Sequence, residues 1–111
     1  MKTLASSAAK EKSVPDATWM PHGREATGRL STAEKASLPA STFAFPRARK
    51  EPMTDATHVR DAMARFNQVG EVTDAERDLA FVNIQKASSH FNIQMKETEW
   101  RQFGSQHAHH E

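Results

Sequence analysis

The chain has 111 residues, of which 37% are hydrophobic and 26% are charged, and its net charge is +1, so it has room for one small domain. The sequence contains no cysteine, which excludes disulfides, thiolate metal sites and cysteine nucleophiles. No apolar run approaches the length of a transmembrane helix.

Charge is divided unevenly along the chain. Residues 1–50 contain nine Lys or Arg and four Asp or Glu, for a net charge of +5, whereas residues 51–111 contain six and ten, for −4. A basic first half and an acidic second half agree with two tasks along the chain, with a self-complementary fold, or with an ordinary mixed surface.

Residues 1–30 form a predicted N-terminal arm that is extended or disordered. Its few large apolar side chains follow neither a helical nor a strand period, and Pro and Gly residues interrupt it. Trp19 stands out, because an indole in a polar arm favours burial. We expect Trp19 to dock, either on the domain of the same chain or on a protein partner.

A short helix and a proline-rich strap are predicted next. Ser31 and Glu34 have the spacing of a capping box, so a helix is expected over about 32–37, before the proline at position 39. Three prolines disfavour a long helix or a central strand over residues 38–53. We therefore expect this strap to be extended.

Phe43 and Phe45 in the strap are expected to point to one side, with Ala44 opposite, because alternate side chains of an extended chain share a face. The strap is then a clasp that two Phe side chains anchor on the helices. Its basic residues are left in water beyond the clasp: Arg47, Arg49 and Lys50.

Two main helices follow the strap. Apolar residues from Val59 to Phe66 recur at helical spacing, which predicts a helix over about 55–68 with Thr54 or Asp55 as its N-cap. A second capping box predicts a longer helix over about 74–90, and the short link makes the two helices an antiparallel or angled pair.

These elements predict an all-α fold, a small helical domain over residues 31–104 clasped by the strap. Short terminal helices flank the two main helices, and residues 105–111 form a flexible His-rich tail. The predicted core, covered by the two strap Phe residues, consists of Val59, Met63, Phe66, Leu79, Ile84, Phe91, Ile93, Trp100 and Phe103.

The strap and the helices also contain short motifs in a fixed order. They are Leu38-Pro39, Ser41, Phe43-Ala44 and Pro46, then Asp55, His58-Val59-Arg60, Ala62 and Ala64-Arg65-Phe66, then Asp74-Ala75-Glu76-Arg77. Over residues 38–103 the chain resembles a family of small uncharacterised bacterial and phage domains with an LPxSxFAxP strap, a DxxHVRxAxARF helix and a DAER helix. The resemblance implies a domain with no assigned activity, sometimes found beside or within phage-related proteins, and it transfers no catalytic residues.

His58 is the one candidate for catalysis, with Asp55 and Asp61 one turn away on either side. This arrangement is compatible with a general base oriented by a carboxylate, or with a surface histidine in local ion pairs. No nucleophile lies at a telling spacing, and no phosphate loop, zincin motif or nucleophile elbow is present. We therefore predict no catalytic residues and no enzyme.

The tail brings His107, His109 and His110 close to one another, and imidazoles at this spacing can chelate a transition metal. A structural site needs ligands that the fold holds in place, which a frayed tail does not supply. We interpret binding there as adventitious and predict no metal site and no cofactor.

Five cations are candidates for one basic face: Arg47, Arg49, Lys50, Arg60 and Arg65. Phosphate contact needs only charge and reach, so non-specific nucleic-acid binding is one interpretation. The other is a solvated strap with intramolecular ion pairs, because acidic residues lie among these cations.

The sequence therefore favours a non-catalytic protein-interaction module, related to phages or mobile elements and either virion-associated or host-interacting. We expect a protein partner that contacts Trp19 and the five cations, a cytoplasmic or virion location, and no membrane association. The alternative is a nucleic-acid-binding accessory protein that uses Arg47, Arg49 and Lys50.

Overall fold

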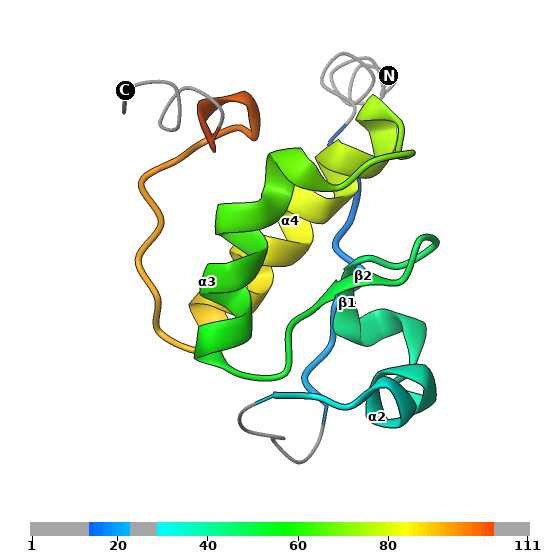
Figure 1. Ribbon diagram of the computed structural model, residues 1–111. Helices are drawn as coiled ribbons and strands as arrows, with labels where there is room; N and C mark the ends of the chain where they lie inside the picture. Colours follow the sequence, from blue (N-terminus) through cyan, green and yellow to red (C-terminus); the bar gives the residue numbers. More distant parts are fainter. Residues whose placement is uncertain (1–13, 23–28, 104–111) are drawn as a thin grey trace, which may run out of the picture.

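The computed structural model describes residues 14–22 and 29–103 of the chain. Its elements are α2 (Thr32–Ser37), η1 (Ala40–Thr42), β1 (Phe43–Phe45), β2 (Lys50–Pro52), α3 (Ala56–Arg65), η2 (Phe66–Gln68) and α4 (Asp74–His90), followed by a helical turn at residues 101–103. The helices α3 and α4 lie side by side, the hairpin β1–β2 packs against them, and α2 lies at the periphery (Figure 1).

The molecule is a small α+β domain, so the predicted all-α fold class is wrong. β1 and β2 pair antiparallel, with Phe43 opposite Pro52 and Phe45 opposite Lys50. Proline is excluded from central strands, but both strands of a two-stranded sheet are edges, so Pro52 is tolerated at the end of β2. The predicted extended strap is therefore a 3-10 turn followed by a hairpin.

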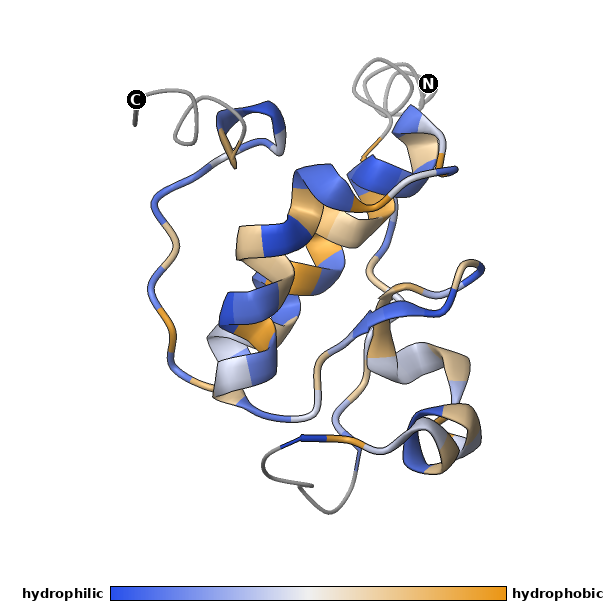
Figure 2. Cartoon of the chain, viewed as in Figure 1, coloured by the Kyte–Doolittle hydropathy of each residue, from blue (hydrophilic) through white to orange (hydrophobic). Residues whose placement is uncertain are grey.

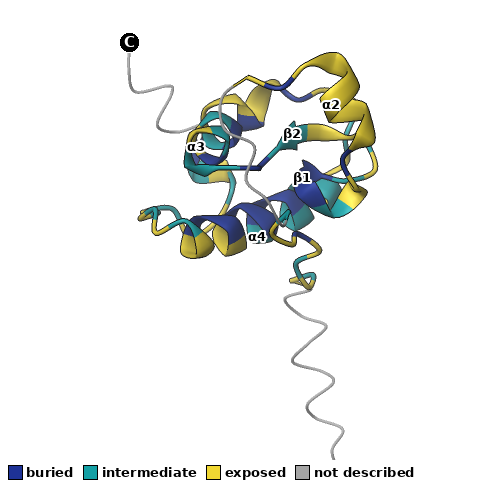
Figure 3. Cartoon of the chain, turned by 90° about the horizontal axis from the view of Figure 1, so that it is seen from below, coloured by how far each residue is buried: buried dark blue, intermediate teal, exposed yellow. Residues whose placement is uncertain are grey.

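Both sides of the hairpin meet apolar side chains, which the strap prediction did not anticipate. All three residues of β1 are buried, and α4 turns its buried side toward β1 (Figure 3). Phe45 and Ala44 enter the main core, whereas Phe43 enters a second cluster with Leu30 and Leu38. The prediction that both Phe side chains anchor the strap on the helices is thus wrong for Phe43.

The helix termini follow the local sequence signals closely. α2 and α4 coincide with the predicted ranges, and each begins with a capping box in which both reciprocal hydrogen bonds are present, Ser31 with Glu34 and Thr73 with Glu76. The N-cap of α3 is Asp55, and the last predicted turn of that helix is the 3-10 segment η2.

The main core lies between α3, α4 and the hairpin, where hydrophobic positions gather in Figure 2. The ring of Phe66 is at its centre, with centroids 5.0 Å from Phe103, 5.5 Å from Phe45 and 5.9 Å from Trp100. Most predicted core residues pack there, although Leu79 is only half-buried. The main core also contains residues that the prediction omitted: Trp19, Ala44, Met53, Ala62, Val69, Ala80, Phe81 and Ala87.

Several predictions concern residues outside the described part of the chain, among them residues 1–13 of the arm, Gly104 and the His-rich tail. Within the described residues, no helix combines the length and the hydrophobicity needed to span a bilayer. In the same residues, no three His, Asp or Glu side chains are grouped so as to hold a metal ion.

Candidate functional site

Trp19 is docked on the domain of its own chain. Residues 14–22, which we call the docked segment, run past the hairpin without regular secondary structure (Figure 1, blue). The Trp19 side chain is 1% exposed, and its indole Nε1–H donates to the carbonyl oxygen of Met53 (3.2 Å). Its ring meets His90 and Phe91 edge-on, with centroids 5.5 and 6.0 Å away. Trp19 is therefore part of the main core, although it lies far along the sequence from the other core residues.

Asn83, near the middle of α4, holds the backbone of the docked segment. Its side chain is fully buried, and its Oδ1 accepts the backbone N–H groups of Thr18 (2.7 Å) and Trp19 (2.9 Å). Its Nδ2 donates to the carbonyl of Ala44 in β1 (3.0 Å) and to Oγ1 of Thr18 (3.1 Å). One buried amide thus links the docked segment, α4 and the hairpin, and its hydrogen-bonding capacity is satisfied.

A third backbone hydrogen bond extends this contact, because the N–H of Met20 donates to the carbonyl of Ser41 (3.0 Å) in η1. We call the residues that receive the docked segment the Trp19 site: Ser41, Ala44, Met53, Asn83, His90 and Phe91. The site combines a buried indole ring with hydrogen bonds to three consecutive backbone N–H groups of the docked segment.

The sequence prediction missed Asn83, although a signal was present. Ala80, Ile84 and Ala87 form the apolar stripe of α4, and Asn83 falls on the same face, three residues after Ala80 and four before Ala87. A polar side chain on an apolar stripe must find hydrogen-bond partners when it is buried. The partner, however, comes from a segment 64 residues away, which no local pattern identifies.

The strap cations do not form one basic face. Arg47 donates to the carboxylate of Glu76 through Nε and through Nη2 (3.1 Å for the latter), and also to the carbonyl of Glu71 (3.0 Å). The hydrogen bond from Arg47 and those from Thr73 lower the pKa of Glu76 to about 2. Arg47 thus braces the start of α4, since Glu76 also belongs to its capping box.

Arg49 lies at the C-terminal end of α2, whereas Arg47 lies at the N-terminal end of α4. Its Nη2 donates to three carbonyls at the C-terminus of α2, those of Lys35 (3.0 Å), Ala36 (3.3 Å) and Leu38 (2.8 Å), and its guanidinium lies 4.6 Å above the ring of Phe43. These contacts satisfy carbonyls that a helix end leaves unpaired. The role of Arg49 in this structure is to cap α2.

Two of the remaining cations meet at another place. Lys50 and Arg65 line a shallow groove with Glu51, whose carboxylate is 4.0 Å from the Arg65 guanidinium. Lys50 and Arg60 form no ion pair with any other described residue. The structure therefore places Trp19 in the core, Arg47 and Arg49 at the ends of two helices, and Arg60 at an exposed position of α3, and of the six predicted partner-binding residues it brings together only Lys50 and Arg65.

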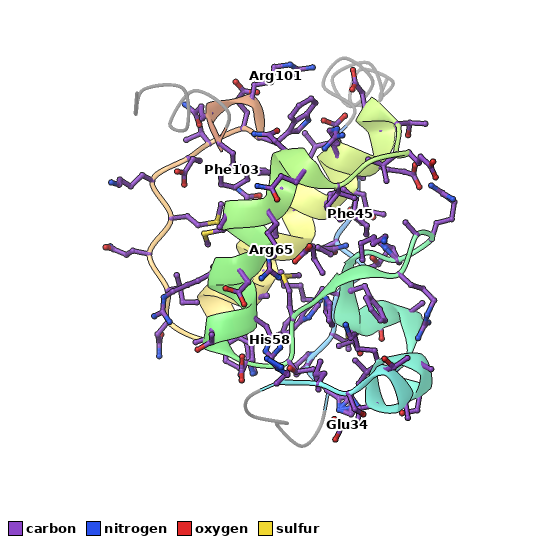
Figure 4. All side chains as sticks on the ribbon, viewed as in Figure 1. Glu34, Phe45, His58, Arg65, Arg101 and Phe103 are labelled. Atoms are coloured by element: carbon purple, nitrogen blue, oxygen red, sulfur yellow. The ribbon has the colours of Figure 1, made fainter. Side chains whose placement is uncertain are left out.

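A charged cleft of about 400 Å³ lies between β2, α3 and α2. Its lining residues are Arg29, Leu30, Lys35, Glu51, Pro52, Thr57, His58, Asp61 and Arg65, of which His58 and Arg65 project from α3 (Figure 4). Nδ1 of His58 is 2.7 Å from Oδ1 of Asp55, which also accepts the His58 backbone N–H. The lining contains both cations and carboxylates, whose charges offset one another in part. The cleft therefore does not favour a ligand of one charge.

Glu51, which lines this cleft, has a strained backbone conformation. Its backbone has φ of 59°, a left-handed conformation that costs a residue with a side chain about 1–2 kcal/mol. Burial raises the pKa of its carboxyl group above the ordinary 4.5, a change that the Arg65 guanidinium offsets only in part. The fold therefore disfavours the ionised form of this carboxyl group relative to the unfolded chain.

We expect Glu51→Gln to make the protein more stable than the parent at pH 7. Because the folded state binds the Glu51 proton more tightly than the unfolded state, parent stability declines as pH rises from about 4.5 through the raised pKa, and the variant lacks this decline. Urea denaturation at several pH values measures both effects, with Glu71→Gln on the surface as the control. A variant less stable than the parent at pH 7 would mean that the Arg65 ion pair outweighs the cost of burial.

Comparison with known proteins identifies a family. The model of a family of unknown function (DUF6582) matches residues 31–98, more than half of the chain. No curated protein and no solved structure matches. All residues of the Trp19 site lie inside the matched range, whereas the docked segment lies outside it.

Proposed function

The chain belongs to this family of unknown function, DUF6582, and we propose that it is a non-catalytic protein-interaction module that recognises a tryptophan-bearing segment without regular secondary structure at the Trp19 site. One observation carries the proposal: the Oδ1 atom of the buried Asn83 side chain accepts two consecutive backbone N–H groups of a segment that has no regular secondary structure. A contact of this kind binds the backbone of a peptide whatever its side chains are. The neighbouring contacts to the indole ring hold the anchor residue of that peptide.

The chemistry of the site suits a peptide ligand. Extended peptides gain affinity from main-chain hydrogen bonds and specificity from pockets for single side chains. Tryptophan is among the residues most often found to dominate binding energy at protein interfaces. At the Trp19 site both contributions come from the matched domain, so a partner segment needs one indole and two consecutive backbone N–H groups that can converge on Asn83 Oδ1.

The nucleic-acid alternative has less support. Arg47 and Arg49 use their guanidinium groups on a carboxylate and on helix carbonyls of the same chain, and Arg65 faces Glu51. Phosphate binding through these residues must compete with those contacts, and neighbouring acids reduce the positive potential. A phage or mobile-element setting, in the cytoplasm or in a virion, is part of the proposal and draws on the motif resemblance.

The proposal is tested by cutting the connection between the docked segment and the domain. A protease recognition sequence replaces residues 24–27 of the full chain, and the purified protein is then cleaved. We expect the released segment to stay bound during gel filtration, because its contacts do not require the peptide link. The same chain with Trp19→Ala is expected to lose its segment on cleavage, and the freed domain is expected to bind a synthetic peptide of residues 14–22 in a calorimetric titration.

Two results would contradict the proposal. One is a domain that stays folded by circular dichroism while the segment with the native Trp19 dissociates at once. The other is a domain that unfolds on cleavage and does not refold with excess peptide, which would make the docked segment an integral part of the fold and not a ligand.

A further inference from the structure

We infer that the Trp19 site also accepts the docked segment of a second copy of this chain, so that two copies exchange residues 14–22 reciprocally. This inference rests on the proposed function and names one partner for the same site. The arrangement of contacts supports this inference. On the docked segment the contacts come from residues 18–20, and on the domain they come from residues 41–91.

The docked segment joins the domain only through residues 23–28, which lie outside the described part of the chain. A contact between residues 18–20 and the Trp19 site is chemically the same whether both belong to one copy or to two. Exchange of an identical element therefore needs no new contact, which makes it a low-cost route to a dimer. The second copy is the one partner whose segment is already known to fit the site.

The positions of the exposed apolar side chains also support an exchange of the docked segment. Among the described residues, the two large hydrophobic side chains left exposed are Val14 (67% exposed) and Met20 (52%), and both belong to this segment. In an exchanged pair this segment, with its exposed side chains, lies against the other copy. A second copy lying there removes apolar surface from water, a gain that the single copy does not make.

Linker length sets the balance between the two arrangements. A short covalent link holds the segment at an effective concentration on the order of millimolar, so the intact chain is expected to be a monomer at micromolar concentration. Shortening the linker removes this advantage, and short hinges under strain favour exchange. Deleting residues 24–27 shortens the reach of the chain by about 14 Å.

The test is the oligomeric state of the full chain without residues 24–27, measured by light scattering at micromolar concentration. We expect a dimer of twice the parent mass. Trp19→Ala in the same shortened chain is expected to be a monomer, and Met20→Ala, which alters only the exposed side of the segment, is expected to dimerise at most a few-fold less tightly. A folded shortened chain that stays monomeric overturns exchange, and so does a dimer that persists with Trp19→Ala.

If the shortened chain fails to fold, two full-length variants decide. Trp19→Ala has an intact site and a defective segment, and Asn83→Ala has an intact segment and a defective site. Mixing them is expected to give a one-to-one heterodimer, and two separate monomers would overturn exchange. The cleavage experiment distinguishes the two ideas: a cleaved segment that stays bound, together with monomeric shortened chains, leaves the proposed function intact and removes only the exchange.

Discussion

Trp19→Ala is expected to lower the free energy of unfolding by about 3–5 kcal/mol, the range found when a buried Phe or Trp is cut back to Ala. The side chain is 1% exposed, and it makes a hydrogen bond to the carbonyl of Met53 and two aromatic contacts. A protein of this size has a total stability on the order of 5–15 kcal/mol, so the loss is a large share of the whole.

Urea denaturation followed by circular dichroism measures this loss. Met20→Ala is the matched control, because Met20 is the next residue, is half exposed, and contributes its backbone N–H and not its side chain to the Trp19 site. We expect the control to stay within about 0.5 kcal/mol of the parent, as surface substitutions usually do. A loss below about 1 kcal/mol for Trp19→Ala would show that the docked segment does not support the domain.

The two capped helices were predictable from the sequence because their signals are local. A capping box needs residues three positions apart, and both boxes form at the expected places. The hairpin was not predicted: the prolines argued only against a long helix or a central strand, and the segment was expected to be extended but unpaired. In such a sheet the missing N–H of Pro52 costs no central hydrogen bond.

The Trp19 site shows a different limit of sequence reasoning. The polarity of the arm and the cost of exposing an indole predicted that Trp19 docks somewhere, with its own domain as one of two destinations, and the structure confirms that destination. The residues that receive it were not predicted, because Asn83 and Met53 lie 64 and 34 residues away along the chain. Only the folded arrangement of α4 and the hairpin brings them together.

The strap cations show how composition misleads when partners are distant. Three cations within four residues suggest a surface for phosphate, yet Arg47 and Arg49 point to opposite ends of different helices. Each guanidinium binds acceptors at a helix terminus, the carboxylate of a capping box in one case and three backbone carbonyls in the other. The spacing of the strap cations in the sequence could not distinguish contacts at helix ends from a basic patch.

Asn83→Ala is expected to lower the free energy of unfolding by about 3 kcal/mol. The substitution leaves the N–H groups of Thr18 and Trp19 and the carbonyl of Ala44 without their partner, and each buried unsatisfied group costs about 1–3 kcal/mol unless it finds water. Undocking of residues 14–22 lets the two N–H groups reach water, so the cost is smaller than the sum. Asn67→Ala, at an exposed position in η2, is the control and is expected to stay near the parent.

A double-mutant cycle between Trp19→Ala and Asn83→Ala separates a shared site from two unrelated losses. Once the docked segment leaves the site in Trp19→Ala, the Oδ1 acceptor of Asn83 has no N–H groups to hold, and removing Asn83 then costs mainly its hydrogen bond to Ala44. The double variant should therefore be more stable than the sum of the single losses predicts, by about 0.5–3 kcal/mol. Strict additivity would mean that Asn83 stabilises the hairpin alone, and the peptide-recognition proposal would lose the observation on which it depends.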